Sequence, residues 1–222
     1  MKTFFLKNYS LPVCSYRGNI KDIQYPCYVS LKLDGELQYI IKKNDKIFSV
    51  NKSKYGRWRM NYKALLEFEE LNLPNGIYLA ELYWGDGRSK EEFYALLRNK
   101  TSDELKLAIW GILQYENYLT LSTTRTYEIL EEIKNQCQNK NFKYLSVIPF
   151  WKVDDEEQLK NLIKEYILEK DYEGLVVRRL DAIYRDGQTI GFIKIKKKVR
   201  EVASKNKNGE KINFKFNYGV WL

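Results

Sequence analysis

Apolar runs that end at Gly, Pro, Asn or Asp recur along the chain and predict many β-strands. The runs are rich in β-branched and aromatic residues, as strands usually are. They cover residues 27–33, 37–42, 46–50, 77–83, 106–113, 145–150, 174–179 and 190–196. Because strands and helices do not alternate regularly along the chain, we expect an α+β domain with antiparallel sheets.

Four segments show the spacing of helices. Residues 61–71 and 124–138 carry apolar side chains at helical spacing. Two further helices are expected to begin near Ser89 and near Asp154, because each residue has a glutamate three positions later, as in a capping box. The second of these starts precedes a core-facing stripe at Leu159, Leu162, Ile163, Tyr166 and Ile167.

The sequence predicts one domain and a short tail. No linker rich in Pro, Gly or Ser is visible before the last stretch, so residues 1–200 are expected to form one domain. Residues 201–222 are expected to form a short basic extension, and its part 207–222 could add one hairpin with "KNGEK" as its turn and "INFKF" and "YGVWL" as strands. No apolar run is long enough to cross a bilayer, and the apolar start ends at Lys7, too early for a signal peptide.

The amino-acid composition narrows the chemistry. The chain of 222 residues contains no histidine, which excludes Ser-His-Asp and Cys-His nucleophile pairs and histidine-based zinc sites. Catalysis would therefore depend on carboxylates, lysines, tyrosines or a hard cation such as Mg²⁺ with oxygen ligands. The three cysteines are scattered without ligand-like spacing, which suits free thiols in a reducing compartment.

The charge of the chain favours a polyanionic partner. Lys and Arg number 38 against 29 Asp and Glu, a formal net charge of +9. Such an excess suits contact with phosphates, and a solvated, lysine-rich surface is the alternative explanation. The bases gather late in the chain, since residues 193–216 hold many of them and only two acids, Glu201 and Glu210.

Five strand-like stretches carry side chains that could react or bind a ligand. They are "SLKLDGEL" with Lys32, "GIYLAELYWGDG" with Glu81, "LKLAIWGIL" with Trp110, "YEGLVVRR" with Glu173, and "GFIKIKKK" with Lys194 and Lys196. The Asp-Gly pair after Lys32 would also suit a surface hairpin with its lysine in water. Lys194 and Lys196 share one face of their strand. They form a fixed pair of cations if that face lines a cleft.

Together these side chains suit phosphoryl chemistry. A lysine attacks only as the free amine, which desolvation or nearby cations such as Lys194 and Lys196 favour. Glu81 and Glu173 could hold a magnesium ion beside a triphosphate, and Trp110 could stack on a purine. Phosphoryl transfer needs alignment and charge neutralisation more than acid–base pairs, which suits a chain without histidine.

The order of these motifs resembles that of the covalent nucleotidyltransferases, which include ATP-dependent DNA ligases, RNA ligases and mRNA capping enzymes. The motifs are Lys-x-Asp-Gly, a carboxylate in a Leu-x-Glu-Leu strand, an aromatic strand, Glu-Gly-Leu-Val-Val and Lys-x-Lys. One motif alone is weak, whereas five in this order, over residues 12–198, are specific. The resemblance implies a ligase-type adenylation domain, with antiparallel sheets flanked by helices and an ATP cleft between them.

The resemblance also implies roles for the charged residues. Lys32 would attack the α-phosphate of ATP and become covalently adenylylated, with release of pyrophosphate. Lys194 and Lys196 would hold the α-phosphate. Glu173 would serve the metal ion, Mg²⁺ or Mn²⁺, and Glu81 would bind the ribose or a metal-bound water.

The other matched residues would surround the nucleotide. Asp34 and Gly35 would shape the loop after the lysine, with Asp34 in contact with substrate or metal-bound water. Glycine at position 35 would let the backbone approach a ligand closely. Ser30 would lie beside the adenine, and Trp110 would stack on it where the family usually has Phe or Tyr.

The chain departs from the DNA ligase pattern in two places. DNA ligases normally carry arginine five residues after the nucleophilic lysine, and a second arginine just after a Phe-Ser pair. This chain has Leu37 and Val50 there, and leucine in the first place resembles some phage-type RNA ligases. Contacts to nucleic acid are then expected from Lys52, Lys54, Arg57, Arg59, Lys197 and Lys198. Too few residues follow Lys196 for an OB-fold domain. We therefore expect a lone adenylation domain, a fragment of a longer protein, or a chain whose clamp or OB-fold is supplied by a separate protein.

The first functional interpretation is an ATP-dependent DNA ligase that seals 5′-phosphate/3′-hydroxyl nicks in replication or repair. An RNA ligase is the second interpretation, and a non-catalytic nucleic-acid-binding module of the same fold is the third. A capping guanylyltransferase is a less favoured interpretation, which a preference for GTP over ATP would support. We expect a monomeric, cytoplasmic protein of bacterial, phage or viral origin that binds ATP, Mg²⁺ and nicked duplex DNA, or RNA, and no membrane.

Overall fold

The computed structural model describes residues 14–17, 22–44, 46–51, 62–84, 104–118, 120–196, 198–205 and 211–218. Within these ranges, side chains are described from residue 22 to 187 and from 191 to 196. No helix in these ranges is both long and apolar enough to span a membrane.

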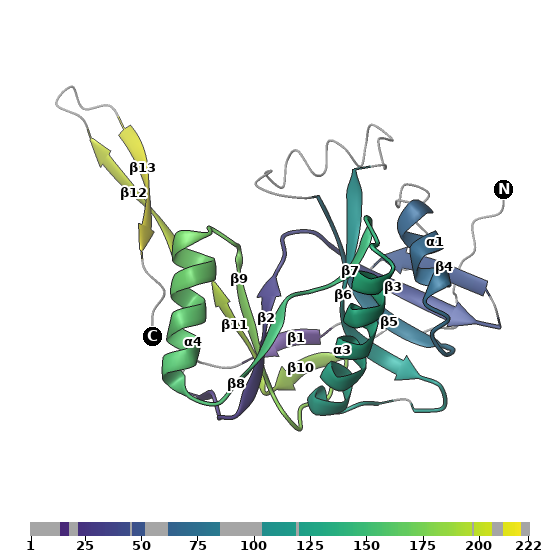
Figure 1. Cartoon of the computed structure of the whole chain (residues 1–222). Coiled ribbons are helices and arrows are strands. Elements are labelled where there is room, and N and C mark those ends of the chain that lie inside the picture. The colour runs from purple at the N-terminus through teal and green to yellow at the C-terminus, as the bar shows by residue number, and fades with distance from the viewer. Residues whose placement is uncertain are drawn as a thin grey trace.

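Two antiparallel sheets form the body of the protein (Figure 1). The larger sheet has the strand order β4-β3-β5-β6-β7 and contains a single parallel pair, β6 with β7. Its strands are β3 (Glu36–Lys43), β4 (Lys46–Asn51), β5 (Gly76–Trp84), β6 (Leu105–Tyr115) and β7 (Leu145–Val147). Strands of such length and apolar content bury both faces of the sheet at its centre, as at Ile40 and Leu79.

Two helices cover one face of the larger sheet. They are α1 (Tyr62–Glu70) and α3 (Thr123–Asn139), and α3 begins at Ser122, whose side chain accepts a hydrogen bond from the Arg125 amide. The apolar side chains of both helices share a core cluster with the sheet, including Phe68, Leu130 and Ile133.

The smaller sheet has the strand order β11-β9-β2-β8, and all its neighbouring strands are antiparallel. Its strands are β2 (Cys27–Lys32), β8 (Phe150–Val153), β9 (Gly174–Arg179) and β11 (Phe192–Lys196). The helix α4 (Glu156–Leu162) continues into the π-helix η2 (Ile163–Glu169). Leu159, Ile163 and Ile167 from these helices join the core cluster that includes Val29 and Leu175 of the sheet.

Two strand pairs lie outside the main sheets. Strand β1 (Cys14–Arg17) pairs in parallel with β10 (Gly187–Ile190). Strand β12 (Lys198–Lys205) pairs antiparallel with β13 (Lys211–Tyr218), and this hairpin projects away from the two sheets at upper left in Figure 1.

The predicted elements within the described ranges are confirmed with specific corrections. The expected strand 145–150 ends at Val147 and is followed by β8, and the expected strand 190–196 is interrupted at Gly191, which has a φ of +91°. Positive φ suits glycine and ends a regular strand. The segment "INFKF" lies in β13 and pairs with β12, whereas most of "YGVWL" lies outside the described residues, so the hairpin expected within 207–222 stays a prediction. The helix expected near Ser89 lies outside the described residues.

Candidate active site

Two rows of side chains line up across the smaller sheet. Lys32 pairs with Gly174, which pairs with Lys196, and one step along the sheet Ser30, Val176 and Lys194 pair in the same order. Directly opposite residues in antiparallel strands point to the same face, and so do residues two apart on one strand. The three lysines and Ser30 therefore share one face of the sheet.

One carboxylate joins two of these lysines. Glu173 directly precedes β9, and its two oxygens accept hydrogen bonds from the Nζ atoms of Lys32 and Lys196. Gly174 puts no side chain between them. Burial raises the pKa of Glu173, but the hydrogen bonds from Lys196 and Lys32 lower it by more. The pKa of Glu173 therefore lies below its usual value. Glu173 therefore stays ionised between two cations.

Glu81 supplies a second carboxylate of opposite character. It comes from β5 in the larger sheet and lies directly across from Leu37. Burial raises the pKa of Glu81 from 4.5 to about 8, and the nearby Lys32 opposes this shift only in part. The carboxylates of Glu173 and Asp34 add to the increase. Glu81 is therefore mainly protonated at neutral pH.

The structure explains why position 35 is a glycine, and the explanation differs from the close approach to a ligand that the sequence predicted. A Cβ atom at this position would lie 2.2 Å from the carbonyl oxygen of Leu82 and 2.9 Å from Cγ of Glu81. No side chain fits at such distances. The glycine therefore lets the turn after Lys32 pack against β5 and brings Glu81 close to it, so the close approach occurs within the protein.

Ser30 and Trp110 lie beside a buried arginine. Arg178 of β9 is 4% exposed, and it donates hydrogen bonds of 2.6 Å to Ser30 Oγ and to the hydroxyl of Tyr127. Its guanidinium carbon lies 5.4 Å from the ring centre of Trp110 and 5.3 Å from that of Phe192. These are distances at which a cation is attracted to an aromatic face.

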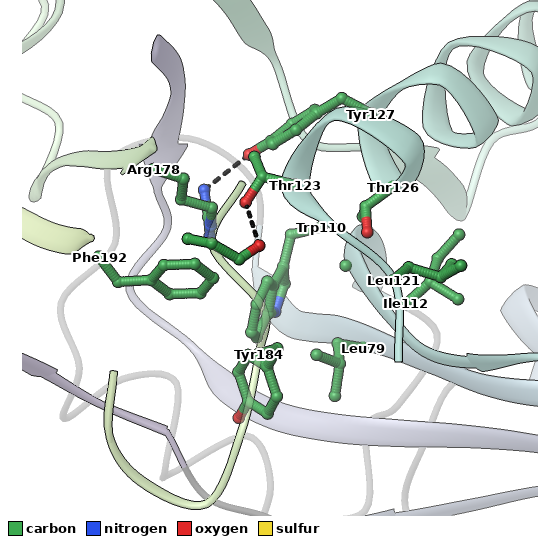
Figure 2. A pocket seen from close by; sticks show the side chains of 12 residues that line it. Leu79, Trp110, Ile112, Leu121, Thr123, Thr126, Tyr127, Arg178, Tyr184 and Phe192 are labelled. Atoms are coloured by element: carbon green, nitrogen blue, oxygen red, sulfur yellow. Dashed lines mark hydrogen bonds between the residues drawn. The ribbon is translucent and has the colours of Figure 1, made fainter. Parts of the chain in front are cut away.

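Arg178, Trp110, Tyr127 and Phe192 line a hollow of about 300 Å³, a volume that includes space open to solvent. Figure 2 shows the side chain of Arg178 between residues of α3, including Tyr127, and the aromatic rings of Trp110, Phe192 and Tyr184. Aromatic walls with a few fixed hydrogen-bonding groups suit a flat heterocycle.

Arg178 was not among the predicted site residues. In the sequence, Arg178 is marked only as a basic residue at the end of the apolar run "GLVVR". Side chains of a strand alternate between its two faces, so the run alone does not say whether this arginine points to the interior. Within the described part of the chain no carboxylate pairs with Arg178, and its partners are hydroxyls and rings. A buried cation without an ion-pair partner is costly unless a ligand or water compensates it.

The other predicted residues fall into two groups. Lys194 and Asp34 are exposed residues beside the Lys32 cluster. Lys52, Lys54, Arg57, Arg59 and Lys197 lie outside the described residues, and only the backbone of Lys198 is described, at the start of β12. In the ranges that are described, no cluster of three metal-ligating side chains is present.

Comparison with known proteins finds similarity in structure and not in sequence. No protein-family model matches the chain, and no curated protein matches it by sequence. A solved structure named "Pmar-Lig_PreS3" has a TM-score of 0.64 and 14% identity over 90% of this chain and 53% of its own. The chain thus spans about half the length of that protein.

Two further solved structures are similar over most of their own length. An ATP-dependent DNA ligase from bacteriophage T7, in complex with ATP, has a TM-score of 0.61 and 15% identity over 91% of this chain and 80% of its own. A Lig E DNA ligase has a TM-score of 0.61 and 16% identity over 94% of this chain and 84% of its own. The chain therefore has the fold of the nucleotidyltransferase domain of ATP-dependent DNA ligases.

Proposed function

We propose that the chain is the adenylation domain of an ATP-dependent polynucleotide ligase that seals nicked duplex DNA. The observation that carries the proposal is the cluster of Lys32, Glu173 and Lys196 on one face of a sheet, within a fold shared with DNA ligases. Fold similarity alone does not assign an activity. The proposal therefore rests on the side chains of the Lys32, Glu173 and Lys196 cluster, which suit nucleotidyl transfer.

Lys32 would carry out the first step as nucleophile. Its Nζ would form a bond to the α-phosphorus of ATP while the bond to the pyrophosphate oxygen breaks. Attack needs the free amine, so Lys32 first has to lose a proton and leave its hydrogen bond with Glu173. Lys196, held on the same side by Glu173, and Lys194 would then stabilise charge on the phosphate oxygens.

The carboxylates fit a magnesium ion that the nucleotide helps to bind. Mg²⁺ in such sites is usually bound by one or two carboxylates together with substrate phosphates and water. The described residues contain no cluster of three metal-ligating side chains, and this mode of binding does not require one. Glu173 is ionised and would be the protein ligand. Bound Mg²⁺ would supply charge neutralisation of the triphosphate, and the protonated carboxyl of Glu81 would donate a hydrogen bond to a ribose oxygen.

The hollow beside Arg178 would receive the base of the nucleotide. Trp110 offers an aromatic face, and Arg178 offers N–H donors that point to hydroxyls of Ser30 and Tyr127. A purine ring carries acceptor nitrogens that such donors can bind. This placement puts the base at the Ser30 row of the sheet and the phosphate at the Lys32 row, two residues away on β2.

Labelling with ATP tests the first step. Protein incubated with α-labelled ATP and Mg²⁺ is expected to retain the label after denaturation, whereas Lys32→Ala is expected to lose it entirely. Lys152→Ala is the matched control, because this exposed lysine lies on β8 of the same sheet. Wild-type protein that takes up no label, or Lys32→Ala that still does, rejects the proposal.

One observation favours RNA as a second candidate substrate. Leu37 stands where DNA ligases normally have arginine, and it lies across from Glu81 in the site. Sealing of a nicked DNA duplex is compared with sealing of the same duplex with an RNA strand at the 3′ or 5′ side of the nick. Faster sealing of all-DNA substrate supports the DNA ligase, and faster sealing with RNA at the nick supports the RNA ligase.

A further inference from the structure

The hairpin of β12 and β13 is a separate two-stranded sheet. In the part of the chain that the structure describes, neither strand is hydrogen-bonded to a third, and Figure 1 shows the pair extending beyond the smaller sheet. An isolated two-stranded hairpin is marginally stable in water. A partner that covers one of its faces would stabilise it.

The strand register divides the hairpin into two unlike faces. Opposite pairs share a face, and the faces alternate along each strand. One face holds the positions of Lys198, Arg200, Val202, Ser204, Ile212, Phe214, Phe216 and Tyr218. The other holds Val199, Glu201, Ala203, Lys205, Lys211, Asn213, Lys215 and Asn217. All three aromatic residues of the hairpin therefore fall on the first face.

The charges on the hairpin favour an anionic partner. Its two strands carry five basic residues and a single acid, Glu201, whose position on the second face lies across the strands from that of Lys215. The first face has two bases and no acid. Lys198 and Arg200 lie at the end nearest β11, and pair with Tyr218 and Phe216. A basic patch interleaved with aromatic residues suits the phosphates and bases of a nucleic-acid strand.

We propose that this face, named here the aromatic face of the hairpin, binds a strand of the polynucleotide substrate. Arg200 and Lys198 would contact phosphates, and Phe216 and Tyr218 would stack on bases. The inference rests on the proposed function and extends it to the substrate. Strand β12 begins two residues after Lys196, which belongs to the cluster of Lys32, Glu173 and Lys196. A strand bound there would lead from the hairpin toward the reactive phosphate.

The test measures binding of a fluorescent nicked duplex to the full chain by anisotropy at several salt concentrations. Arg200→Ala is expected to weaken binding several-fold and to reduce the slope of log affinity against log salt by about 0.9. Phe216→Ala is expected to weaken binding about tenfold with the salt slope unchanged, because stacking releases no counterions.

The matched control removes a base from the opposite face. Lys215→Ala changes the net charge as Arg200→Ala does, and its position lies across the strands from the only acid of the two strands, Glu201. Because Lys215 lies on the second face, this variant is expected to retain wild-type affinity and salt slope. Affinity that falls equally in Lys215→Ala and Arg200→Ala overturns the inference, because then only total charge counts.

Three further results overturn it. The first is a wild-type chain that does not bind nucleic acid, and the second is aromatic-face variants that bind as well as wild type. The third is a change in oligomeric state with Phe216→Ala while affinity for the duplex is unchanged, which would assign the face to a protein partner. Uptake of label from ATP is measured on the same samples, so failure of the adenylation proposal is seen separately, and label uptake by the variants shows that they are folded.

Discussion

At the scale of single residues, the site keeps two carboxylates around one lysine in opposite protonation states. Glu173 accepts hydrogen bonds from two ammonium groups and is ionised. Glu81 is partly buried and lies across from Leu37, and a leucine offers no charge to compensate its desolvation. An uncharged side chain at position 37 thus has a physical consequence in the protein itself, because it leaves the carboxyl of Glu81 without a compensating charge on the neighbouring strand.

The raised pKa of Glu81 makes the stability of the fold depend on pH. Between the ordinary value of 4.5 and about 8, the folded protein holds a proton that the unfolded chain releases. The free energy of unfolding therefore falls as pH rises through this window, by at most about 1.4 kcal/mol per pH unit, and levels off above it. Urea unfolding at several pH values measures this fall, and Glu81→Gln is expected to reduce it.

Substitution of Leu37 provides the control for this explanation. Leu37→Arg places a cation across the strands from Glu81, lowers the pKa of the carboxyl and is expected to shrink the fall in stability. Leu37→Met keeps a neutral side chain of similar volume and is expected to retain it. If Leu37→Arg shows the full pH dependence, Glu81 is not its source.

At the scale of elements, one carboxylate fastens a helix to the edge of the larger sheet. Glu67 of α1 accepts hydrogen bonds of 3.0, 2.8 and 2.7 Å from the backbone amides of Lys143, Tyr144 and Leu145. Those amides lead into β7, which pairs in parallel with β6 and lies far from α1 in sequence. The three bonds thus fix where the edge strand begins.

Removal of this carboxylate should destabilise the protein. Glu67→Ala leaves backbone amides without their acceptor, and hydrogen bonds to charged groups contribute about 1.5–3 kcal/mol each at most. Because water can reach the outer amide, we expect a loss of about 2 kcal/mol in the free energy of unfolding, measured in urea. Glu69→Ala, an exposed change of equal charge on the same helix, should cost less than about 0.5 kcal/mol; an equal loss there would refute the explanation.

Elements with a strong local pattern were predictable, and those fixed by distant contacts were not. The strands β2 and β9 carry continuous apolar runs with turn residues at their ends, and sequence predicts them within a residue or two. The π-helix that follows α4 was expected as ordinary helix. Its Tyr166 packs 4.7 Å from Trp151 and 5.9 Å from Tyr172 between ring centres, contacts that no local pattern displays.

The site shows the same division between local and distant signals. The proximity of Lys32, Glu173 and Lys196 was predictable because each lies in a motif whose order resembles that of a known family, and their roles stay a prediction. Arg178 was not, because its importance comes from Ser30 and Tyr127, which are 148 and 51 residues away in sequence. A base in an apolar run is informative only when the fold shows which face it occupies.

At the scale of the whole molecule, both main sheets contribute to the candidate site. The smaller sheet supplies Lys32, Lys196 and Arg178, and the larger sheet supplies Glu81 and Trp110. A nucleotide bound by both groups would therefore link the two sheets. A ligand that binds only the folded state also stabilises it, by about 2.7 kcal/mol at 100 times its Kd.

Thermal unfolding with and without nucleotide tests this link. ATP is expected to raise the Tm of Lys32→Ala, which binds without forming a covalent bond, whereas the rise should be largely lost when Trp110→Leu is added. Trp151→Leu, added to Lys32→Ala, is the matched control, because Trp151 packs against Tyr166 and not in the hollow. Each protein is compared with itself, so the cost of the substitution cancels. If ATP raises the Tm by the full amount when Trp110→Leu is present, the base binds elsewhere. The nucleotide would then not link the two sheets through Trp110.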